Sequence, residues 1–400
     1  MSPNSQLPSL HQSQAILMNM ISAKEISLII YIYSYIYNTV LMIEIKADEM
    51  EGGGQILRSS LSLSSVLHAP VKLFNIRAKR AKPGMQAQHL TGVQAASMMA
   101  DAQTQGFAKG STELAYSPSS IHGGDFRFNV GTAGSSMLVL QTILPLAAFA
   151  PSDVSIKIIG GTHVAWSPNF NYVKEVFFPL LKKTGFSPSS FGLERAGWYP
   201  KGGGSVTFSS KPVDYLQSIN LESPGKLLKI CGVSCCSNLP DIVAERQAES
   251  AKQILGENGY GDVEIEKQVL PSPSKGSALT LYAVCENSIL SASSLGALGK
   301  KSEKVGEEAA KGLLAEMTSC AALDRHTGDQ LLIYMALAKG ESSVTVGELT
   351  PHIKTNIWVL EQFVDARFRV EELGNHARIA VKGIGLERSQ LRSAEQAQRI

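Results

Sequence analysis

The sequence has almost no excess charge. Its 37 Lys and Arg residues face 35 Asp and Glu residues, which gives a formal net charge of +2 over 400 residues. No overall electrostatic field therefore attracts a polyanion, and any nucleic-acid binding must come from local patches. Hydrophobic residues make up 44% of the chain and charged residues 18%. This composition excludes disorder, collagen and a polytopic membrane protein, and the length predicts two or three domains with real cores.

Cysteine is also scarce. The five cysteines lie in one stretch, at Cys231, Cys235, Cys236, Cys285 and Cys320. They are too few for a disulfide scaffold, which indicates a reducing compartment, and their spacing lacks the paired pattern of a zinc site. The chain also lacks the signatures of P-loop, α/β-hydrolase, zincin and Rossmann proteins.

An apolar run near the N-terminus, Ser27–Ile43, has the length of a signal peptide or a short anchor. It lacks a cationic leader and a small-residue cleavage site, and it is too short for a confident membrane span. We therefore interpret residues 1–41 as an N-terminal extension outside the native protein, with natural initiation at Met42. The alternative is a true targeting segment.

From Met42 onward, strand-like and helix-like patterns alternate. A strand at Ile43–Lys46 precedes a glycine loop and a helix at Gln55–Leu67. The same unit recurs, with further helices predicted over 88–103, 133–150, 171–182, 329–335 and 355–368. Such recurrence predicts an α/β protein in which repeated subdomains form a large domain, residues 42–222 and 320–390. The composition changes between about 223 and 319, which predicts an inserted smaller α/β domain.

Three short segments offer groups for an anion. Gly52–Gly54, ahead of a helix, and Gly131–Ser136, ahead of another, can present bare N–H groups. Arg77, Lys79, Arg80 and Lys82 place four cations within six residues, which suits several phosphates. The alternatives are an ordinary turn and a solvated loop. Histidine is a suitable nucleophile toward phosphorus near neutral pH, but the residues alone do not choose among the eight histidines.

Seven sequence blocks together carry a resemblance to a known family. The blocks, in chain order, are EGGGQILRSSLSLS (51–64), RAKRAKPGMQAQHL (77–90), GTAGSSMLVLQTILP (131–145), GGTHVAWSPNFNY (160–172), GWYPKGGG (197–204), GDQLLIYMALA (328–338) and LTPHIKTNI (349–357). With these blocks the chain resembles the RNA 3'-terminal phosphate cyclase family.

The resemblance implies a fold and a reaction. The expected fold is a large domain of repeated α/β units, each with two helices on a four-stranded sheet, interrupted by a small α/β domain. The expected reaction is the ATP-dependent conversion of an RNA 3'-phosphate into a 2',3'-cyclic phosphodiester. It passes through a covalent histidine–AMP intermediate and an RNA-adenylate intermediate. The implied partners are ATP and RNA with a 3'-phosphate end, in the cytoplasm, or in the nucleus if the organism is eukaryotic. We expect no stable membrane partner.

The resemblance also assigns roles to residues of this chain. His352 matches the nucleophile, and Glu51 matches the acid associated with a divalent metal, Mg²⁺ or Mn²⁺. The positions of the nucleotide contacts are Gln141, Pro168, His326, Asp329 and Gln330. The positions of the phosphate and RNA-end contacts are Arg58, Arg77, Arg80, Gln88 and His89.

Some positions depart from the family pattern. Lys79 replaces a common glycine, Ala47-Asp48-Glu49 replaces Asp-Gly-Ser, and His326 replaces a frequent tyrosine. Two other functions stay open at this point. One is a non-catalytic cyclase-like protein of ribosome biogenesis (rRNA processing), a branch that lacks the histidine. The other is a nucleic-acid-binding module without chemistry.

Overall fold

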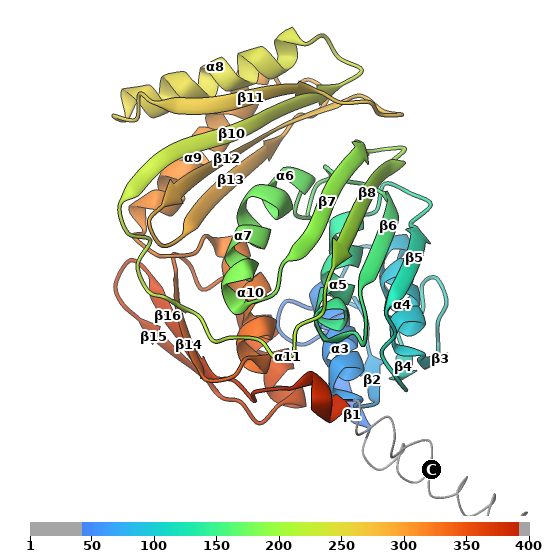
Figure 1. Ribbon diagram of the computed structural model, residues 1–400. Coiled ribbons are helices and arrows are strands. Elements are labelled where there is room, and N and C mark those ends of the chain that lie inside the picture. The colour runs from blue at the N-terminus through green and yellow to red at the C-terminus, as the bar shows by residue number, and fades with distance from the viewer. Residues whose placement is uncertain (1–41, 392–400) are drawn as a thin grey trace, which may run out of the picture. The chain divides into compact units, whose positions relative to one another are not determined.

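Four separate four-stranded sheets organise the part of the chain that the computed structural model describes, residues 42–391. Figure 1 shows each sheet with its own helices. Three of these units, here called the first, second and third repeats, share one chain order: strand, helix, strand, helix, strand, strand. The fourth unit interrupts the third repeat and is here called the inserted unit. The predicted fold class, α/β with repeated subdomains, is confirmed.

The repeats are built from short elements. The first repeat comprises β1 (Ile43–Lys46), α3 (Gly54–Leu67), β2 (Val71–Phe74), α4 (Ala87–Ala100), β3 (Gln103–Gln105) and β4 (Leu114–Ser117). The second comprises β5 (Gly124–Asn129), α5 (Ser136–Phe149), β6 (Val154–Gly160), the helical run α6 (Phe170–Tyr172), η1 (Val173–Phe177), α7 (Phe178–Leu181) and η2 (Lys182–Thr184), then β7 (Pro188–Arg195) and β8 (Gly204–Ser210). The third comprises β9 (Asn220–Leu221), α10 (Arg325–Leu337), β14 (Glu341–Val346), α11 (Pro351–Phe363), β15 (Phe368–Glu372) and β16 (Ala377–Lys382).

The three repeats also share one sheet topology. Their strand orders are β1-β2-β4-β3, β5-β6-β8-β7 and β9-β14-β16-β15. In each sheet the first two strands are parallel and the other pairings are antiparallel. The first helix of each repeat therefore connects two parallel strands, as in a βαβ unit.

The helices of the repeats pack on one another as well as on their sheets. α3 contacts α5 and α11, and α4 contacts α5. Every residue of α5 is buried except Gln141, so this helix is a central element of the core. A partly exposed glutamine on such a helix marks the place where the core opens.

The inserted unit has a different strand order. It comprises β10 (Leu227–Ser237), α8 (Ile242–Glu257), β11 (Val263–Val269), β12 (Gly276–Cys285), β13 (Ile289–Leu295) and α9 (Ser302–Thr318), with sheet order β11-β10-β12-β13. An apolar cluster of its own includes Leu255, Leu281 and Leu313. α8 and α9 pack so closely that a Cβ atom at Gly306 would collide with the carbonyl of Gln247.

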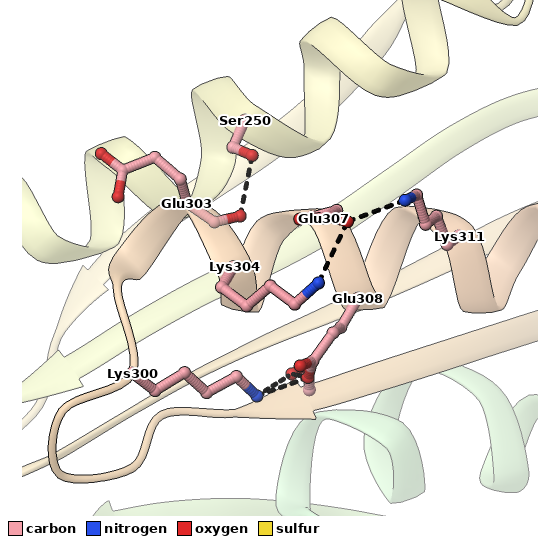
Figure 2. A network of polar contacts seen from close by, with 8 residues as sticks. Ser250, Lys300, Glu303, Lys304, Glu307, Glu308 and Lys311 are labelled. Atoms are coloured by element: carbon pink, nitrogen blue, oxygen red, sulfur yellow. Dashed lines mark hydrogen bonds and ion pairs between the residues drawn. The ribbon is translucent and has the colours of Figure 1, made fainter.

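Hydrogen bonds and ion pairs on α9 connect residues of the inserted unit to one another, as Figure 2 shows. The Ser250 hydroxyl donates to the carbonyl of Glu303 at 2.8 Å. Lys304 and Lys311 both pair with Glu307, at 3.1 and 2.7 Å. Exposed pairs of this kind add little to the stability of the fold, because water screens their charges.

Hydrogen bonds also connect the inserted unit to the repeats. Trp198 Nε1 donates to the hydroxyl of Ser237 at 2.8 Å. The backbone N–H and the hydroxyl of Ser291 both donate to Asp324 Oδ2, at 3.0 and 2.7 Å. The other oxygen of Asp324 caps α10 by accepting from the N–H groups of its first turn. One buried carboxylate thus links β13 to the start of α10.

Several predicted boundaries were wrong. α11 begins at Pro351, not at 355, because Thr350 caps the helix and proline suits its first position. It ends at Phe363, and the remaining residues up to Phe368 lead into β15. α4 ends at Ala100, because Asp101 is left-handed and β3 follows.

Two expectations about domain boundaries stay predictions. The extension over 1–41 lies outside the described residues, and the described residues from Ile43 to 391 belong to one compact unit. The five cysteines carry free thiols. Within residues 42–391, no helix has both the length and the hydropathy to cross a membrane.

Candidate active site

A cavity of about 850 Å³ lies where helices of the first and third repeats begin. Residues from all three repeats and from β13 of the inserted unit line it. The structure brings to its walls all twelve residues to which the resemblance assigns roles: Glu51, Arg58, Arg77, Arg80, Gln88, His89, Gln141, Pro168, His326, Asp329, Gln330 and His352. Their placement in one cavity is observed, whereas their individual roles stay predictions.

Four helices present their N-terminal ends to this cavity: α3, α4, α10 and α11. Side chains cap three of them, namely Gln86 with His89 on α4, Asp324 on α10 and Thr350 on α11. α3 has Gly53 at its N-cap position and no side-chain cap. Helix N-termini carry partial positive charge, and that of α3 has no side-chain cap on its N–H groups, so the four together favour an anionic ligand.

The glycines before α3 are required by their neighbours. A Cβ atom at Gly53 would collide with the carboxylate of Glu51, and one at Gly54 would collide with Nε2 of His89. Gly52 has a φ of 63°, in the left-handed region. The glycine loop thus lets a carboxylate and an imidazole approach the start of the helix closely.

His352 is the second residue of α11, and its exposed side chain lines the cavity. Desolvation within the cavity lowers the pKa of His352, and the charges of Arg58, His326 and Arg80 lower it further. The ring is therefore neutral at pH 7, and a neutral imidazole has a lone pair available for nucleophilic attack.

A buried polar group connects Asp329 to α3. Gln55 Nε2 donates to Asp329 Oδ2 at 3.0 Å. Burial raises the pKa of Asp329 to about 7, and the positive charge of Arg58 opposes this rise. Burial likewise lowers the pKa of Arg58 to about 10, and Asp329 opposes that change. Arg58 still carries its charge at pH 7, with Asp329 as its acidic neighbour.

Asn356 fixes the helices on which these groups lie. Its Nδ2 donates to the carbonyl of Asp329 at 2.7 Å, and its Oδ1 accepts from the Ser59 hydroxyl at 2.6 Å. One buried amide thereby joins α11 to both α10 and α3. Positions on these three helices are thus set by hydrogen bonds as well as by packing.

His89 is a neutral imidazole that accepts a hydrogen bond and has a second ring nitrogen able to donate one. Its Nδ1 accepts from the backbone N–H of Gln86 at 3.1 Å, so the proton of the neutral ring lies on Nε2. Burial lowers the pKa of His89 to about 3, with further lowering by Arg58 and Arg77. Gln88 Oε1 accepts from the N–H of Ser135 at 2.9 Å and ties α4 to the start of α5.

Glu51 is the acidic residue nearest the glycine loop. One carboxylate oxygen forms an ion pair with Arg80, and its N–H donates to the Thr355 hydroxyl at 3.3 Å. The other oxygen, Oε2, is buried and has no hydrogen-bond partner within residues 42–391. Over the same residues, no group of three or more His, Cys, Asp or Glu side chains could hold a metal ion. A hard divalent ion would therefore take one oxygen from the protein and the rest from phosphates and water, as Mg²⁺ commonly does.

Two of the anion-binding segments need correction. In Gly131–Ser136, the N–H groups of Gly131, Gly134, Ser135 and Ser136 already donate to acceptors in the protein, so the interpretation of this loop as an open nest is wrong. In the basic segment, Lys79 Nζ donates to the carbonyl of Asp48, and of the four cations only Arg77 and Arg80 line the cavity.

Sequence reasoning missed other lining residues, notably Gln55, Arg325, Trp166 and Ser293. Gln55 gave a weak signal, since it is a polar residue at the start of an apolar helix. Arg325 is paired with Glu316 and Glu348, so its charge is largely compensated. Ser293 lies in a serine-rich strand whose sequence carries no chemical signature.

The chain is similar to known proteins over most of its length. The sequence profile described as RNA 3'-terminal phosphate cyclase matches residues 49–370. The protein named RNA 3'-terminal phosphate cyclase from Ignicoccus hospitalis is 44% identical over 355 residues, covering 87% of this chain and all of that protein. Those of the same name from Pyrobaculum aerophilum and Hyperthermus butylicus are 41% and 44% identical, covering 87% and 86% of this chain and 100% and 98% of those proteins.

Among solved structures, the enolpyruvyl transferase NikO from Streptomyces tendae aligns with a TM-score of 0.33 and 9% identity, over 86% of this chain and 48% of that one. The profile match over most of the chain and the identity to full-length relatives are decisive. This chain belongs to the RNA 3'-terminal phosphate cyclase family.

Proposed function

We propose that the protein converts an RNA 3'-terminal phosphate into a 2',3'-cyclic phosphodiester at the expense of ATP. The observation that carries the proposal is His352, whose neutral ring faces an 850 Å³ cavity between Arg58, Arg80 and the starts of four helices. A nucleophile among cations suits attack on a phosphorus atom, because the charge that builds up there is stabilised where it forms.

The first step uses His352. Its ring nitrogen attacks the α-phosphorus of ATP, so a P–N bond forms and the bond to the leaving pyrophosphate breaks. The RNA 3'-phosphate then attacks the same phosphorus, breaks the P–N bond and becomes an adenylate. Finally the adjacent 2'-hydroxyl attacks the RNA phosphorus, loses its proton and releases AMP. Activation is necessary because a phosphate monoester dianion is a poor electrophile without a good leaving group.

The cations of the cavity would position and stabilise the phosphates. Arg58 is held at the start of α3 close to Asp329, and Arg80 lies on the basic loop. Charge stabilisation and positioning are the main contributions that a protein makes to phosphoryl transfer. His89 adds a neutral N–H donor beside the glycine loop.

The residues present also fit a divalent ion. Glu51 Oε2 is buried and unpaired among the described residues, and Gly53 leaves room for it beside the helix start. Mg²⁺ or Mn²⁺ bound there would neutralise negative charge on the triphosphate. The nucleotide itself would contact Gln141, Pro168, His326, Asp329 and Gln330, which also line this cavity.

The test is conversion of a 3'-phosphorylated RNA oligonucleotide into a phosphatase-resistant cyclic end. We expect product only with both ATP and a divalent ion, and none from an oligonucleotide with a 3'-hydroxyl end. His352→Asn should abolish conversion, whereas His376→Asn, in the turn between β15 and β16, should leave it unchanged. A wild-type protein that binds RNA without regard to the terminal phosphate, and makes no cyclic product, would point instead to a non-catalytic family member.

A further inference from the structure

Trp166 is an unusual residue of the cavity wall. It lies in the loop between β6 and α6, and six consecutive residues of this loop, 164–169, line the cavity. The residue is 98% exposed. Its φ of 63° is in the left-handed region, which bulky side chains rarely adopt. Backbone conformations of this kind persist where the surrounding structure imposes them, and they gather at functional sites.

The loop that carries Trp166 is held firmly at both ends. The N–H groups of Thr162 and His163 both donate to the carbonyl of Gly197, at 2.9 and 3.2 Å. Phe170 N–H donates to the carbonyl of Thr162 at 3.0 Å and closes the loop at its base. The Ser167 hydroxyl donates to the carbonyl of Val164 at 3.0 Å, on either side of the tryptophan. The protein thus presents this ring from a fixed position.

Packing within the protein does not explain the position of the Trp166 ring. Of the three tryptophans, Trp198 is 3% exposed, stacks on His163 with ring centroids 4.7 Å apart, and donates to Ser237. Trp358 is partly buried. Trp166, by contrast, leaves almost all of its apolar surface in water at the edge of a polar, cationic cavity. Burial of this ring against the flat apolar face of a ligand would be energetically favourable.

We propose that Trp166 is a stacking platform for a nucleobase of the RNA strand near its 3'-phosphate end. This inference rests on the proposed cyclase function. Sites for small ligands enclose most of the ligand surface, so a ring with almost no covering suits a strand that continues into solvent better than an enclosed adenine. Aromatic platforms of single-strand-binding proteins work in this way, because every base has a face to stack.

The experiment measures binding of two 3'-phosphorylated RNA decamers, one complete and one abasic at its last two nucleosides. The wild-type protein should bind the complete decamer about 5- to 100-fold more tightly. Trp166→Ala should bind both decamers equally and weakly, and Trp166→Phe should regain most of the difference. Phe107→Ala removes an exposed aromatic residue outside the cavity wall, and it should behave like the wild type.

Two further readouts separate the possible failures. The complete decamer should quench the emission of the exposed tryptophan in the wild type but not in Trp166→Ala, and labelling of the protein by ATP should be unchanged in that variant. Equal binding of the complete decamer by wild type and Trp166→Ala would overturn the proposal. So would loss of ATP labelling parallel to loss of RNA binding, because the ring would then serve the adenine or the fold. Absence of cyclic product from the wild type would count against the cyclase function alone, since binding and quenching still test the platform.

Discussion

The repeats and the inserted unit each combine four strands with helices, yet they use their helix ends and charges differently. α3, α4, α10 and α11 of the first and third repeats begin at the cavity, and they place Arg58, His89, Asp329 and His352 on its walls. The inserted unit contributes neutral side chains of β13, and charges on α8 and α9 pair with each other at the surface. Similar components therefore form a cavity lined by charged groups in one region and a solvated, charged surface in the other.

The difference can be stated in electrostatic terms. Charges on the inserted unit are energetically inexpensive, because water screens them and several are paired with an opposite charge. Charges in the cavity are partly desolvated, and the shifted pKa values of Arg58, His89 and Asp329 record that cost. Desolvated charged groups of this kind are typical of sites where they contribute to binding or to chemistry. Substitutions on the two sides should therefore have very different effects.

Apart from loss of the nucleophile itself, the largest effect is expected at Arg58. Arg58→Ala should slow transfer of the adenylyl group by about 10²- to 10³-fold, because one preorganised donor to the developing charge is lost. The measurement is the single-turnover rate of protein labelling by ATP. Arg246→Ala removes an exposed arginine of α8 in the inserted unit, where it is paired with Glu303; this variant serves as the control and should not change the rate. Comparable rates for both variants would remove the distinction between the two regions.

Asp329→Asn should raise the free energy of unfolding, while it weakens binding of the nucleotide at the site. Burial raises the pKa of Asp329 in the folded state to about 7, above its ordinary 3.8, so folding takes up a proton between these values and stability falls as pH rises through that window. Replacement by Asn removes this loss, for a gain on the order of 1 kcal/mol or more at pH 8.

Urea unfolding at pH 8 and at pH 5 tests this sign. The gain should be larger at pH 8, where the wild-type carboxyl is ionised in both states, and it should shrink toward pH 4. A variant that is less stable than the wild type at pH 8 would show that the ionised carboxylate, with Gln55 and Arg58, stabilises the fold.

Arg80→Gln should have an intermediate effect on RNA capture. We expect about tenfold weaker binding of a 3'-phosphorylated oligonucleotide, equivalent to ~1.4 kcal/mol. The slope of log affinity against log salt should also fall by about one unit, because a phosphate contact releases counterions. If a salt titration shows the same affinity and slope for this variant as for the wild type, the loop is a solvated surface that does not contact the RNA phosphate.

The smallest effect is expected from the inserted unit. Ser293 lines the cavity, but its hydroxyl already donates to Thr280 at 3.1 Å within the same sheet. Ser293→Ala should therefore change the cyclisation rate by less than about threefold, or ~0.6 kcal/mol. A loss as large as that of Arg58→Ala would mean that the inserted unit takes part in the chemistry.

The sequence predicted the α/β repetition well, because helices such as α3 and α5 carry clear apolar patterns. It did not predict β9, since two residues, Asn220–Leu221, are too few to show a period of two. The start of α11 was missed because Pro351 looks like a helix breaker unless its first-turn position is known. Phe368 was assigned to that helix, but in the structure it lies in a strand and pairs with Val381 of the neighbouring strand.

The site could be predicted only through the resemblance. From residue chemistry alone, His352 could not be chosen among eight histidines, because Arg58 and Arg80, which lower its pKa, lie far away in the sequence. The same limit explains the error at Gly131–Ser136. Its N–H groups are satisfied by acceptors that include Gln88 and Gly161, which only the folded chain brings near.

The central claim is that the ring of His352 is the nucleophile of this cavity. The most direct measurement is to incubate the protein with ATP and a divalent ion, digest it, and locate the AMP adduct by mass spectrometry. The account predicts a single adduct on the α11 peptide, at His352, and no adduct in His352→Asn. An adduct on another residue, or one that persists in His352→Asn, would contradict it.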